Sequence, residues 1–252
     1  MTQNNGENSH ETVLVVNPAG SSAIVLVCEH ASHHIPATFA ALGLAEDDQT
    51  SHAAWDPGAM DVARLLSASL NATLIASGVS RLIYDCNRPP DARDAMPERS
   101  EAIAVPGNVG LSAKDRADRA AAFYVPFRDQ LHSAIQKKPK PIIITIHSFT
   151  PIYYGKQRSV EIGVLHDTDA RLADAMLANF ADHTTFDVQR NAPYGASDGV
   201  THTLQEHAIK DGHLNVMLEV RNDLIATPQQ QRAMAKMLTS WITNTCDTLN
   251  VD

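Results

Sequence analysis

The chain has 252 residues, of which 44% are hydrophobic and 19% are charged, so it is long enough to form one large α/β domain with its own core. Its 29 acidic residues outnumber its 20 lysines and arginines and give a formal net charge of -9. A surface of this sign repels phosphate groups, which excludes nucleic acids and anionic membranes as expected partners. An anionic small molecule would have to be held by local arginines.

The cysteines and the N-terminus indicate a reduced, cytoplasmic protein. Cys28, Cys86 and Cys246 are far apart in the sequence, so neither a disulfide framework nor a CxxC metal knuckle is expected. Residues 1–11 are polar, with no basic region and no apolar core, which predicts a disordered tail and no signal peptide. No apolar run reaches the roughly 20 residues that a membrane span needs. We therefore expect a single domain within residues 1–252.

Hydrophobic patterning and turn residues divide the chain into alternating strands and helices. The predicted elements, in chain order, are strands over 13–16 and 23–28, helices over 35–44 and 56–70, strands over 73–76 and 81–86, a helix over 114–136, strands over 141–146 and 160–165, a helix over 169–180, a strand over 186–189, a helix over 201–209, a strand over 214–220 and a helix over 227–249. This alternation indicates a largely parallel sheet with helices on both faces.

Polar clusters stand at the carboxyl ends of four predicted strands. They are Glu29-His30, Asp85 to Arg88, His147-Ser148 and Glu219 to Arg221. In open α/β sheets, ligands bind at the edge where the carboxyl ends of the strands meet. Four clusters from distant parts of the sequence therefore predict one shared site at that edge.

Histidines at two of these strand ends are candidate metal ligands. Zinc binds imidazole and carboxylate groups, and a catalytic zinc keeps a fourth position for water. One histidine at a strand end is as often a hydrogen-bonded structural residue, but His30 and His147 occupy equivalent positions, which favours a metal. His33 also has ligand spacing from His30. Asp56, in the segment SHAAWDPGA, is expected to cap a helix, and one of its oxygens could also bind a metal.

Glu219 is the candidate general base, because a carboxylate near a metal-bound water can take its proton. An ion pair with Arg221 on the same strand face is the alternative for this side chain. Asn87 and Arg88 open the proline-rich loop over 89–108, and an arginine can hold a substrate carboxylate with two hydrogen bonds. For Arg88, an ion pair with a nearby aspartate is the competing interpretation.

The motifs around these residues resemble the N-formylglutamate amidohydrolase family over about residues 25–225. The matching segments, in order, are CEHAS, SHAAWDPGA, SRLIYDCNRP, AVPGN, IHSFTP, IGVLHD, NAPYGASDGVTHT and LEVRNDL. That family is related in fold to the zinc carboxypeptidases and the aspartoacylase-like deacylases. The resemblance implies a three-layer α/β/α fold with a mostly parallel mixed sheet, of the zinc-carboxypeptidase and phosphorylase/hydrolase-like type. It also implies a zinc-dependent amidohydrolase that releases formate from N-formyl-L-glutamate.

The resemblance also implies roles for single residues. IHSF resembles the carboxypeptidase segment that carries the last zinc histidine, here His147, and LEVRND resembles the segment of the catalytic glutamate, here Glu219. DCNRP resembles the Asn-Arg pair that grips a substrate carboxylate, here Asn87 and Arg88. A side-chain carboxylate of the substrate would then be held by a further arginine, Arg158 or Arg221.

The chain departs from the carboxypeptidase pattern at the first ligand motif, where His-x-x-Glu is replaced by HASH, from His30 to His33. Either His33 replaces the glutamate or Asp56 supplies the carboxylate, and the family pattern favours Asp56. We therefore expect zinc at His30, Asp56 and His147, with Glu219 as the base. The alternatives are a deacylase or carboxypeptidase-like amidase of other specificity, and a metal-containing protein that binds a small acidic ligand without turnover.

Overall fold

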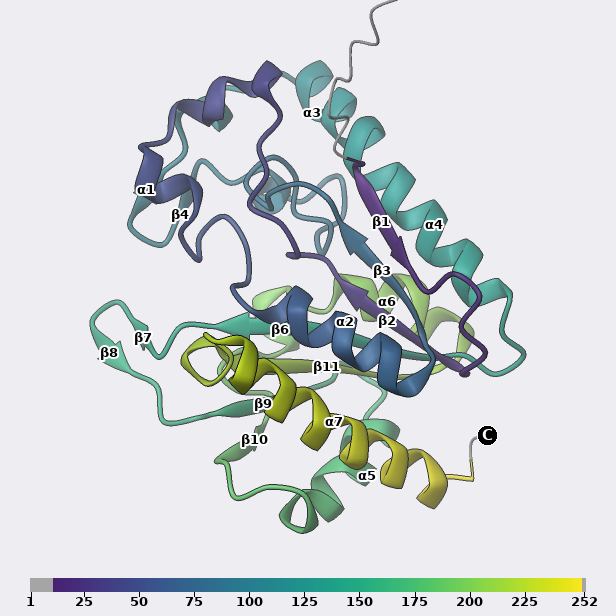
Figure 1. Ribbon diagram of the computed structural model, residues 1–252. Coiled ribbons are helices and arrows are strands. Elements are labelled where there is room, and N and C mark those ends of the chain that lie inside the picture. Colours follow the sequence, from purple (N-terminus) through teal and green to yellow (C-terminus); the bar gives the residue numbers. More distant parts are fainter. Residues whose placement is uncertain (1–10, 251–252) are drawn as a thin grey trace, which may run out of the picture.

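A seven-stranded mixed sheet forms the centre of the computed structural model, which describes residues 11–250 (Figure 1). The strands lie in the order β1-β3-β2-β6-β11-β9-β10. Strands β3, β2, β6 and β11 run parallel, whereas β1 and β9 run antiparallel to β3 and β11, and β10 follows the direction of β9. The strands are β1 Val13–Val16, β2 Ile24–Cys28, β3 Thr73–Ser77, β6 Ile142–Phe149, β9 Ile162–Leu165, β10 Val188–Arg190 and β11 Leu214–Arg221.

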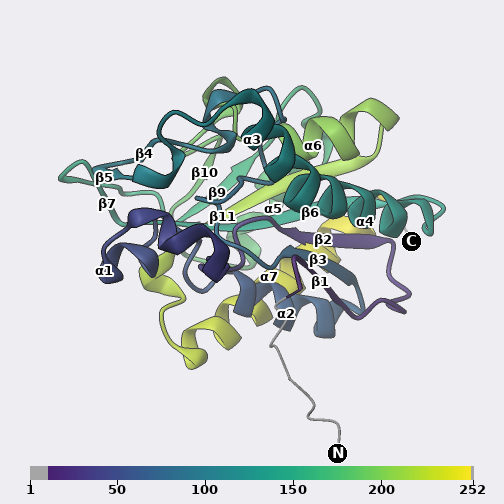
Figure 2. The same cartoon turned by 90° about the horizontal axis from the view of Figure 1, so that it is seen from above.

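Helices cover both faces of this sheet (Figures 1 and 2). Helices α2, α5 and α7 share one hydrophobic cluster with the sheet, and α4 and α6 share a second cluster on the opposite face. The predicted α/β fold with a mixed, mostly parallel sheet between helices is therefore confirmed. The helices are α1 Glu46–Gln49, α2 Ala59–Leu70, α3 Ala113–Arg119, α4 Val125–Gln136, α5 Arg171–Asn179, α6 His202–His207 and α7 Pro228–Thr248.

Strand β2 shows why both faces need a helix layer. All five of its residues are buried. Because side chains alternate along a strand, Ile24, Leu26 and Cys28 enter the cluster under α2 and α7, while Val25 and Val27 enter the cluster under α4. A continuous apolar run is thus the pattern of a central strand that is covered on both sides.

Two short hairpins extend from this frame. One pairs β4 (Arg99–Ser100) with β5 (Ile103–Ala104), and the other pairs β7 (Ile152–Tyr153) with β8 (Lys156–Gln157). The first belongs to the proline-rich loop over 89–108, and the second follows β6 directly. Both hairpins reach the cavity described below.

The predicted strand over 81–86 is wrong. These residues form turns, in which the backbone N–H of Ile83 donates to the carbonyl of Ser80 at 2.9 Å and that of Leu82 donates to the Ser80 hydroxyl at 3.1 Å. Leu82, Ile83 and Tyr84 are nevertheless fully buried. The apolar run therefore indicates burial correctly, but the Ser80 side chain satisfies the backbone locally and replaces strand pairing.

Several element boundaries also differ from expectation. Helix α2 begins at Ala59 with Gly58 as its N-cap, at a φ of 81°, so Asp56 is not the helix cap that was predicted. Residues 37–43 form 3₁₀ turns and no regular helix. The predicted helix over 114–136 is interrupted by a π-helical turn before Pro126, because proline has no N–H to continue the α-helical bonds.

The prediction of a disordered tail over 1–11 lies outside the described residues, apart from Glu11. The three cysteines are buried and form no disulfide. Within residues 11–250, no helix is long and apolar enough to cross a membrane.

Histidine 207 on α6 makes the stability of this fold sensitive to acid. Its side chain is buried, and burial lowers its pKa to about 4. The folded protein then keeps His207 neutral while the unfolded chain takes up a proton below about pH 6.5, so this contribution to stability is present above that pH and is lost as the pH falls toward 4.

We expect the free energy of unfolding to fall by about 2 kcal/mol between roughly pH 7.5 and pH 5 because of His207. Urea unfolding at both pH values should show this loss in the wild type and a smaller loss in His207→Gln. His132→Gln, which replaces an exposed histidine on α4, is the matched control and should behave as wild type. Equal pH dependence in all three proteins would remove His207 from the explanation.

Candidate functional site

The site lies at the carboxyl ends of β2, β6 and β11, as three of the four polar clusters predicted, whereas the fourth, Asp85 to Arg88, follows buried turns and no strand. Strands β2 and β6 pair with Val27 beside Thr145, so Glu29 and His147 come next to each other two residues later. On the other side of β6, Glu219 of β11 is paired with His147. Strand β6 continues to Phe149, so His147 lies within the strand and not beyond its end as predicted.

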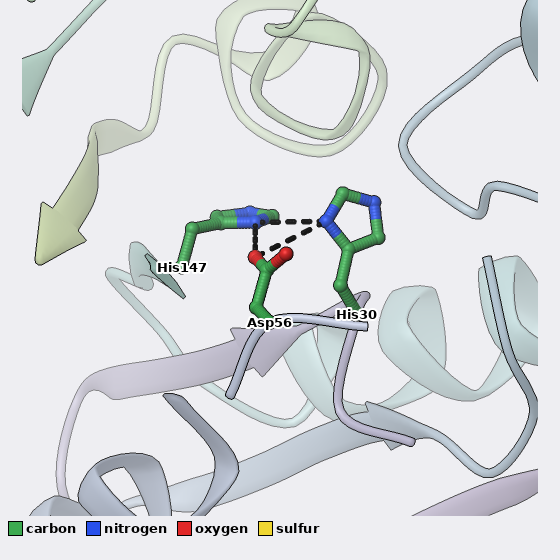
Figure 3. A group of neighbouring side chains, drawn as sticks. All are labelled: His30, Asp56 and His147. Atoms are coloured by element: carbon green, nitrogen blue, oxygen red, sulfur yellow. Dashed lines mark hydrogen bonds and ion pairs between the residues drawn. The ribbon is translucent and has the colours of Figure 1, made fainter. Parts of the chain in front are cut away.

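Three buried side chains come together at this edge (Figure 3). Oδ2 of Asp56 lies 3.2 Å from Nδ1 of His30 and 2.9 Å from Nδ1 of His147, and the two Nδ1 atoms are 3.2 Å apart. Ligands that surround zinc tetrahedrally at its usual bond lengths stand about 3.3 Å from each other. The three atoms are therefore spaced as the corners of one face of such a tetrahedron, and the group could hold a metal ion.

His33, the alternative third ligand, is not part of this group. It is exposed, and its ring packs edge-on against Trp55 with 4.9 Å between the ring centres. Asp56 reaches the group because its backbone N–H donates to the carbonyl of His30 at 2.9 Å. Of the two alternatives, the structure places Asp56 beside the histidines.

The outer nitrogen of each histidine meets a further carboxylate. Nε2 of His30 lies 2.8 Å from Oδ1 of Asp85, and Nε2 of His147 lies 3.1 Å from Oε2 of Glu29. The second contact is an ion pair without hydrogen-bond alignment. A carboxylate behind a metal-bound histidine fixes the ring and leaves its other nitrogen free for the metal. Asp85, which lies in the motif DCNRP, was not predicted in this role.

Burial opposes a charge on these groups, but close partners overcome it. Burial would raise the pKa of Asp85, yet the positive charges of His30 and Arg81 bring it well below its usual range. Burial would lower the pKa of His147, yet the negative charge of Glu29 helps to raise it well above the usual value. The group is thus a set of buried side chains whose opposite charges keep one another ionised.

The charges of this set balance with two protons or with one divalent cation. Three carboxylates stand against the one positive charge of Arg81, which contacts Asp56 at 3.4 Å and Asp85 at 3.1 Å. Protons on both histidines complete the balance in the metal-free protein. A divalent cation between neutral imidazoles would supply the same two positive charges. The carboxylates are those of Glu29, Asp56 and Asp85.

Glu219 stands beside this set with a carboxylate that is not engaged. It is 5% exposed, and its Oε2 atom has no hydrogen-bond partner among the described residues 11–250. Burial raises its pKa to about 7. The alternative of an ion pair with Arg221 is wrong, because Arg221 pairs with Asp223 at 2.8 Å and with Glu161 at 3.3 Å. Near neutral pH, Glu219 can both accept and release a proton.

The cavity in front of these groups has a volume of about 710 Å³ and is lined by His30, Asp56, His147 and Glu219. Among the predicted substrate-binding residues, Asn87, Arg88 and Arg158 line it and Arg221 does not. The proline-rich loop contributes Ser100 and Glu101 to the lining. His52 and Tyr153 also line the cavity, and Arg81 and Tyr194 are lining residues that were not predicted.

Asn87 and Arg88 are engaged within the protein. The Asn87 amide donates to the carbonyl of Val200 at 2.6 Å and accepts from the N–H of Thr203 at 2.9 Å. Nε of Arg88 donates to Asp94 at 2.7 Å, which is the ion pair expected as the competing interpretation. Asn87 thus joins the cavity wall to the start of α6.

Gly163 allows the opposite wall to approach the sheet. It lies on β9 and is paired with Glu219. A Cβ atom at this position would lie 2.0 Å from the carbonyl oxygen of Ala192, which is closer than any real contact. Only glycine therefore lets the segment that carries Tyr194 pack here.

The fold and the site define an α/β protein with a histidine–aspartate–histidine group in a cavity at the carboxyl edge of its sheet. The chain belongs to the N-formylglutamate amidohydrolase family, whose model matches residues 22–226. The comparison with curated proteins gave no significant match.

Two solved structures show the same fold. The crystal structure of a gene product from Agrobacterium tumefaciens has a TM-score of 0.93 and 50% identity, with 95% of this chain and 96% of that chain covered. The N-formylglutamate amidohydrolase from Ralstonia eutropha has a TM-score of 0.66 and 16% identity, with 95% and 98% covered. The match to the family model confirms the predicted family, and both structures share the fold of this chain.

We expect the His30, Asp56 and His147 group to bind one divalent metal ion per chain. Replacing His147 by alanine removes one of the three ligands and should lower the bound metal to a small fraction of an equivalent after dialysis. Metal content by elemental analysis measures this. His33→Ala is the matched control and should keep the full equivalent, whereas loss of metal in that variant would contradict the choice of Asp56.

The carboxylate behind His30 should contribute to metal affinity without touching the metal. In Asp85→Asn we expect metal affinity to fall by roughly 10-fold to 100-fold, because the amide orients the imidazole less strongly and does not increase its basicity. Competition with a chelator measures the affinity. An unchanged affinity in this variant would show that the His30 ring is held by packing alone.

Proposed function

We propose that this protein hydrolyses the amide bond of an N-acyl amino acid, such as N-formyl-L-glutamate, with zinc as its metal. The observation that carries the proposal is the unpaired, buried carboxylate of Glu219 in the same cavity as a group of metal-ligand geometry. Family membership supports amide hydrolysis as the reaction. A cytoplasmic location stays a prediction.

His30, Asp56 and His147 would hold the zinc ion. When bound, zinc acidifies water and polarises the acyl carbonyl group. Asp85 and Glu29 keep the two imidazoles oriented from behind. Buried charge that is already matched and fixed by these contacts needs little rearrangement during the reaction.

Glu219 is the proposed general base and general acid. It takes a proton from the attacking water, whose oxygen forms the new bond to the acyl carbon. It then gives the proton to the amine nitrogen as the carbon–nitrogen bond breaks, so the products are a carboxylic acid and a free amino acid. A carboxyl group with a pKa of about 7 can perform both transfers at neutral pH.

The cavity supplies the remaining selectivity. Its volume of about 710 Å³ accommodates a small molecule, and its wall carries arginines although the protein is acidic overall. The proposed roles of Asn87 and Arg88 at the substrate carboxylate remain predictions. Asp94, the ion-pair partner of Arg88, is a carboxylate with which a substrate would compete.

The Glu219→Gln variant should keep its metal and lose hydrolysis, because the amide cannot take the proton. We expect kcat to fall by roughly 100-fold to 10,000-fold. The assay is release of formate or other acid from a panel of N-acyl amino acids, including N-formyl-L-glutamate. Glu161→Gln, at a carboxylate outside the cavity, is the control and should retain wild-type kcat.

The outcomes separate two kinds of protein. Unchanged turnover in Glu219→Gln would remove this residue from the mechanism. If the wild type bound metal and N-acyl amino acids but released acid from none of them, the protein would be a binding protein with this fold.

A further inference from the structure

The arginines of the cavity differ in whether a carboxylate already neutralises them. Arg81 contacts Asp56 and Asp85, and Arg88 contacts Asp94. No carboxylate in the described part of the chain lies within 4.0 Å of the Arg158 guanidinium. Arg158 is thus the arginine of the cavity wall whose charge is left for a ligand.

Aromatic rings surround this guanidinium. Its central carbon lies 4.3 Å from the ring centre of Tyr153, 4.9 Å from that of Tyr194 and 5.5 Å from that of Phe149. Such rings pack against the flat guanidinium and restrict its motion. The N–H groups, which lie in the plane of the guanidinium, are therefore the part that an anion can reach.

Most of these N–H groups have no partner in the part of the chain that the structure describes. NH2 donates to the Tyr194 hydroxyl at 2.9 Å and NH1 donates to the Thr150 carbonyl at 3.3 Å. A guanidinium carries five N–H donors, so three lack a partner among residues 11–250. A carboxylate is the group that matches two parallel donors of an arginine.

The position of Arg158 relative to the reacting groups fits a substrate contact. Arg158, Tyr194 and Glu219 line the same cavity as the metal-ligand group. The arginine is held in place by its hairpin, where its backbone N–H donates to the carbonyl of Pro151 at 2.8 Å.

One carboxylate at the rim could compete for Arg158, but it is held elsewhere. Glu101 lies 2.6 Å from Nε2 of His52 and accepts a hydrogen bond from the backbone N–H of Tyr154 at 3.3 Å. The second contact joins the β4–β5 hairpin to the β7–β8 hairpin. Glu101 thus forms its ion pair with His52 and not with Arg158.

We propose that Arg158 is the carboxylate anchor of this cavity and determines its specificity for anionic N-acyl amino acids, with Tyr153, Tyr194 and Phe149 holding the guanidinium ready. The assignment rests on the proposed function for the class of substrate. Arg88 is then expected to contribute less to substrate binding, because it already forms an ion pair with Asp94. The carboxylate in question is either the α-carboxylate or the side-chain carboxylate of the substrate.

The test measures binding apart from turnover. N-formyl-L-glutamate is titrated into the metal-loaded Glu219→Gln protein by calorimetry, with and without a second substitution. We expect Arg158→Met to weaken Kd by roughly 30-fold or more, and Arg158→Lys, which keeps the charge but not the fork, to weaken it less. Arg128→Met is the matched control, because Arg128 lies over a tyrosine ring at 6.0 Å outside the cavity, and it should bind as the parent does.

Two carboxamides then identify the carboxylate. N-formyl-L-glutamine lacks the side-chain carboxylate and N-formyl-L-isoglutamine lacks the α-carboxylate. If one compound binds equally well with and without the Arg158→Met substitution, the carboxylate that this compound lacks is the one that Arg158 binds. The proposal is overturned if neither compound loses this dependence, if Arg88→Met weakens binding more than Arg158→Met, or if N-formyl-L-glutamate does not bind at all.

The same variants keep this proposal separate from the proposed function. If the wild type hydrolyses the substrate and Arg158→Met does so equally well, the role of Arg158 is rejected and the proposed function is retained. Binding that depends on Arg158, without hydrolysis by the wild type, would reject the function and leave the anchor standing. Circular dichroism of each variant checks that the fold is retained.

Discussion

The pairing of β6 with β2 on one side and with β11 on the other is the constraint on which the site depends. A parallel register fixes which residues stand next to each other at the end of the strands. It places Glu29 and Glu219 on either side of His147, although the three residues are far apart in the sequence. The two glutamates have different roles because only Glu29 has a buried cation within ion-pair distance. One hydrogen-bonding pattern thus produces both a supporting carboxylate and a free one.

Buried charge is the second constraint. Ionised groups without solvent are stable only where opposite charges are close. At this site the carboxylates exceed the fixed positive charge of Arg81 by two, so the protein must take up either protons or a metal ion. Metal binding and proton uptake are therefore alternatives at the same atoms. Such a site releases protons as it binds a metal, and its affinity for the metal falls in acid.

Much of this architecture can be predicted from the sequence, because buried strands appear as apolar runs and strands alternate with helices along the chain. The central strands are continuous apolar runs, and the polar residues that end them mark the binding edge. The strand expected over 81–86 fails because burial alone does not distinguish a paired strand from a buried turn. Asp56 was expected to cap a helix, but Gly58 takes that role and leaves the carboxylate free to reach the histidines.

The contacts that sequence reasoning missed are those between segments without a shared motif. Glu29 meets His147 across 118 positions of the chain, and nothing local to Glu29 indicates that contact. The ring environment of Arg158 is similar, because its aromatic residues come from β6, the β7–β8 hairpin and the segment before α6. Spacing in the sequence predicts which residues share an element, and tertiary packing decides which elements meet.

The width of the cavity depends on Gly163, a residue without a side chain. The wall that carries Tyr194 rests directly on the backbone of β9, at the position paired with Glu219. A single added carbon atom would clash with the Ala192 carbonyl and move that wall, including Tyr194, which lines the cavity and contacts Arg158. A substitution at Gly163, which has no side chain, can therefore change the selectivity of the cavity. Relatives can differ in selectivity through this position while the residues that line the cavity stay the same.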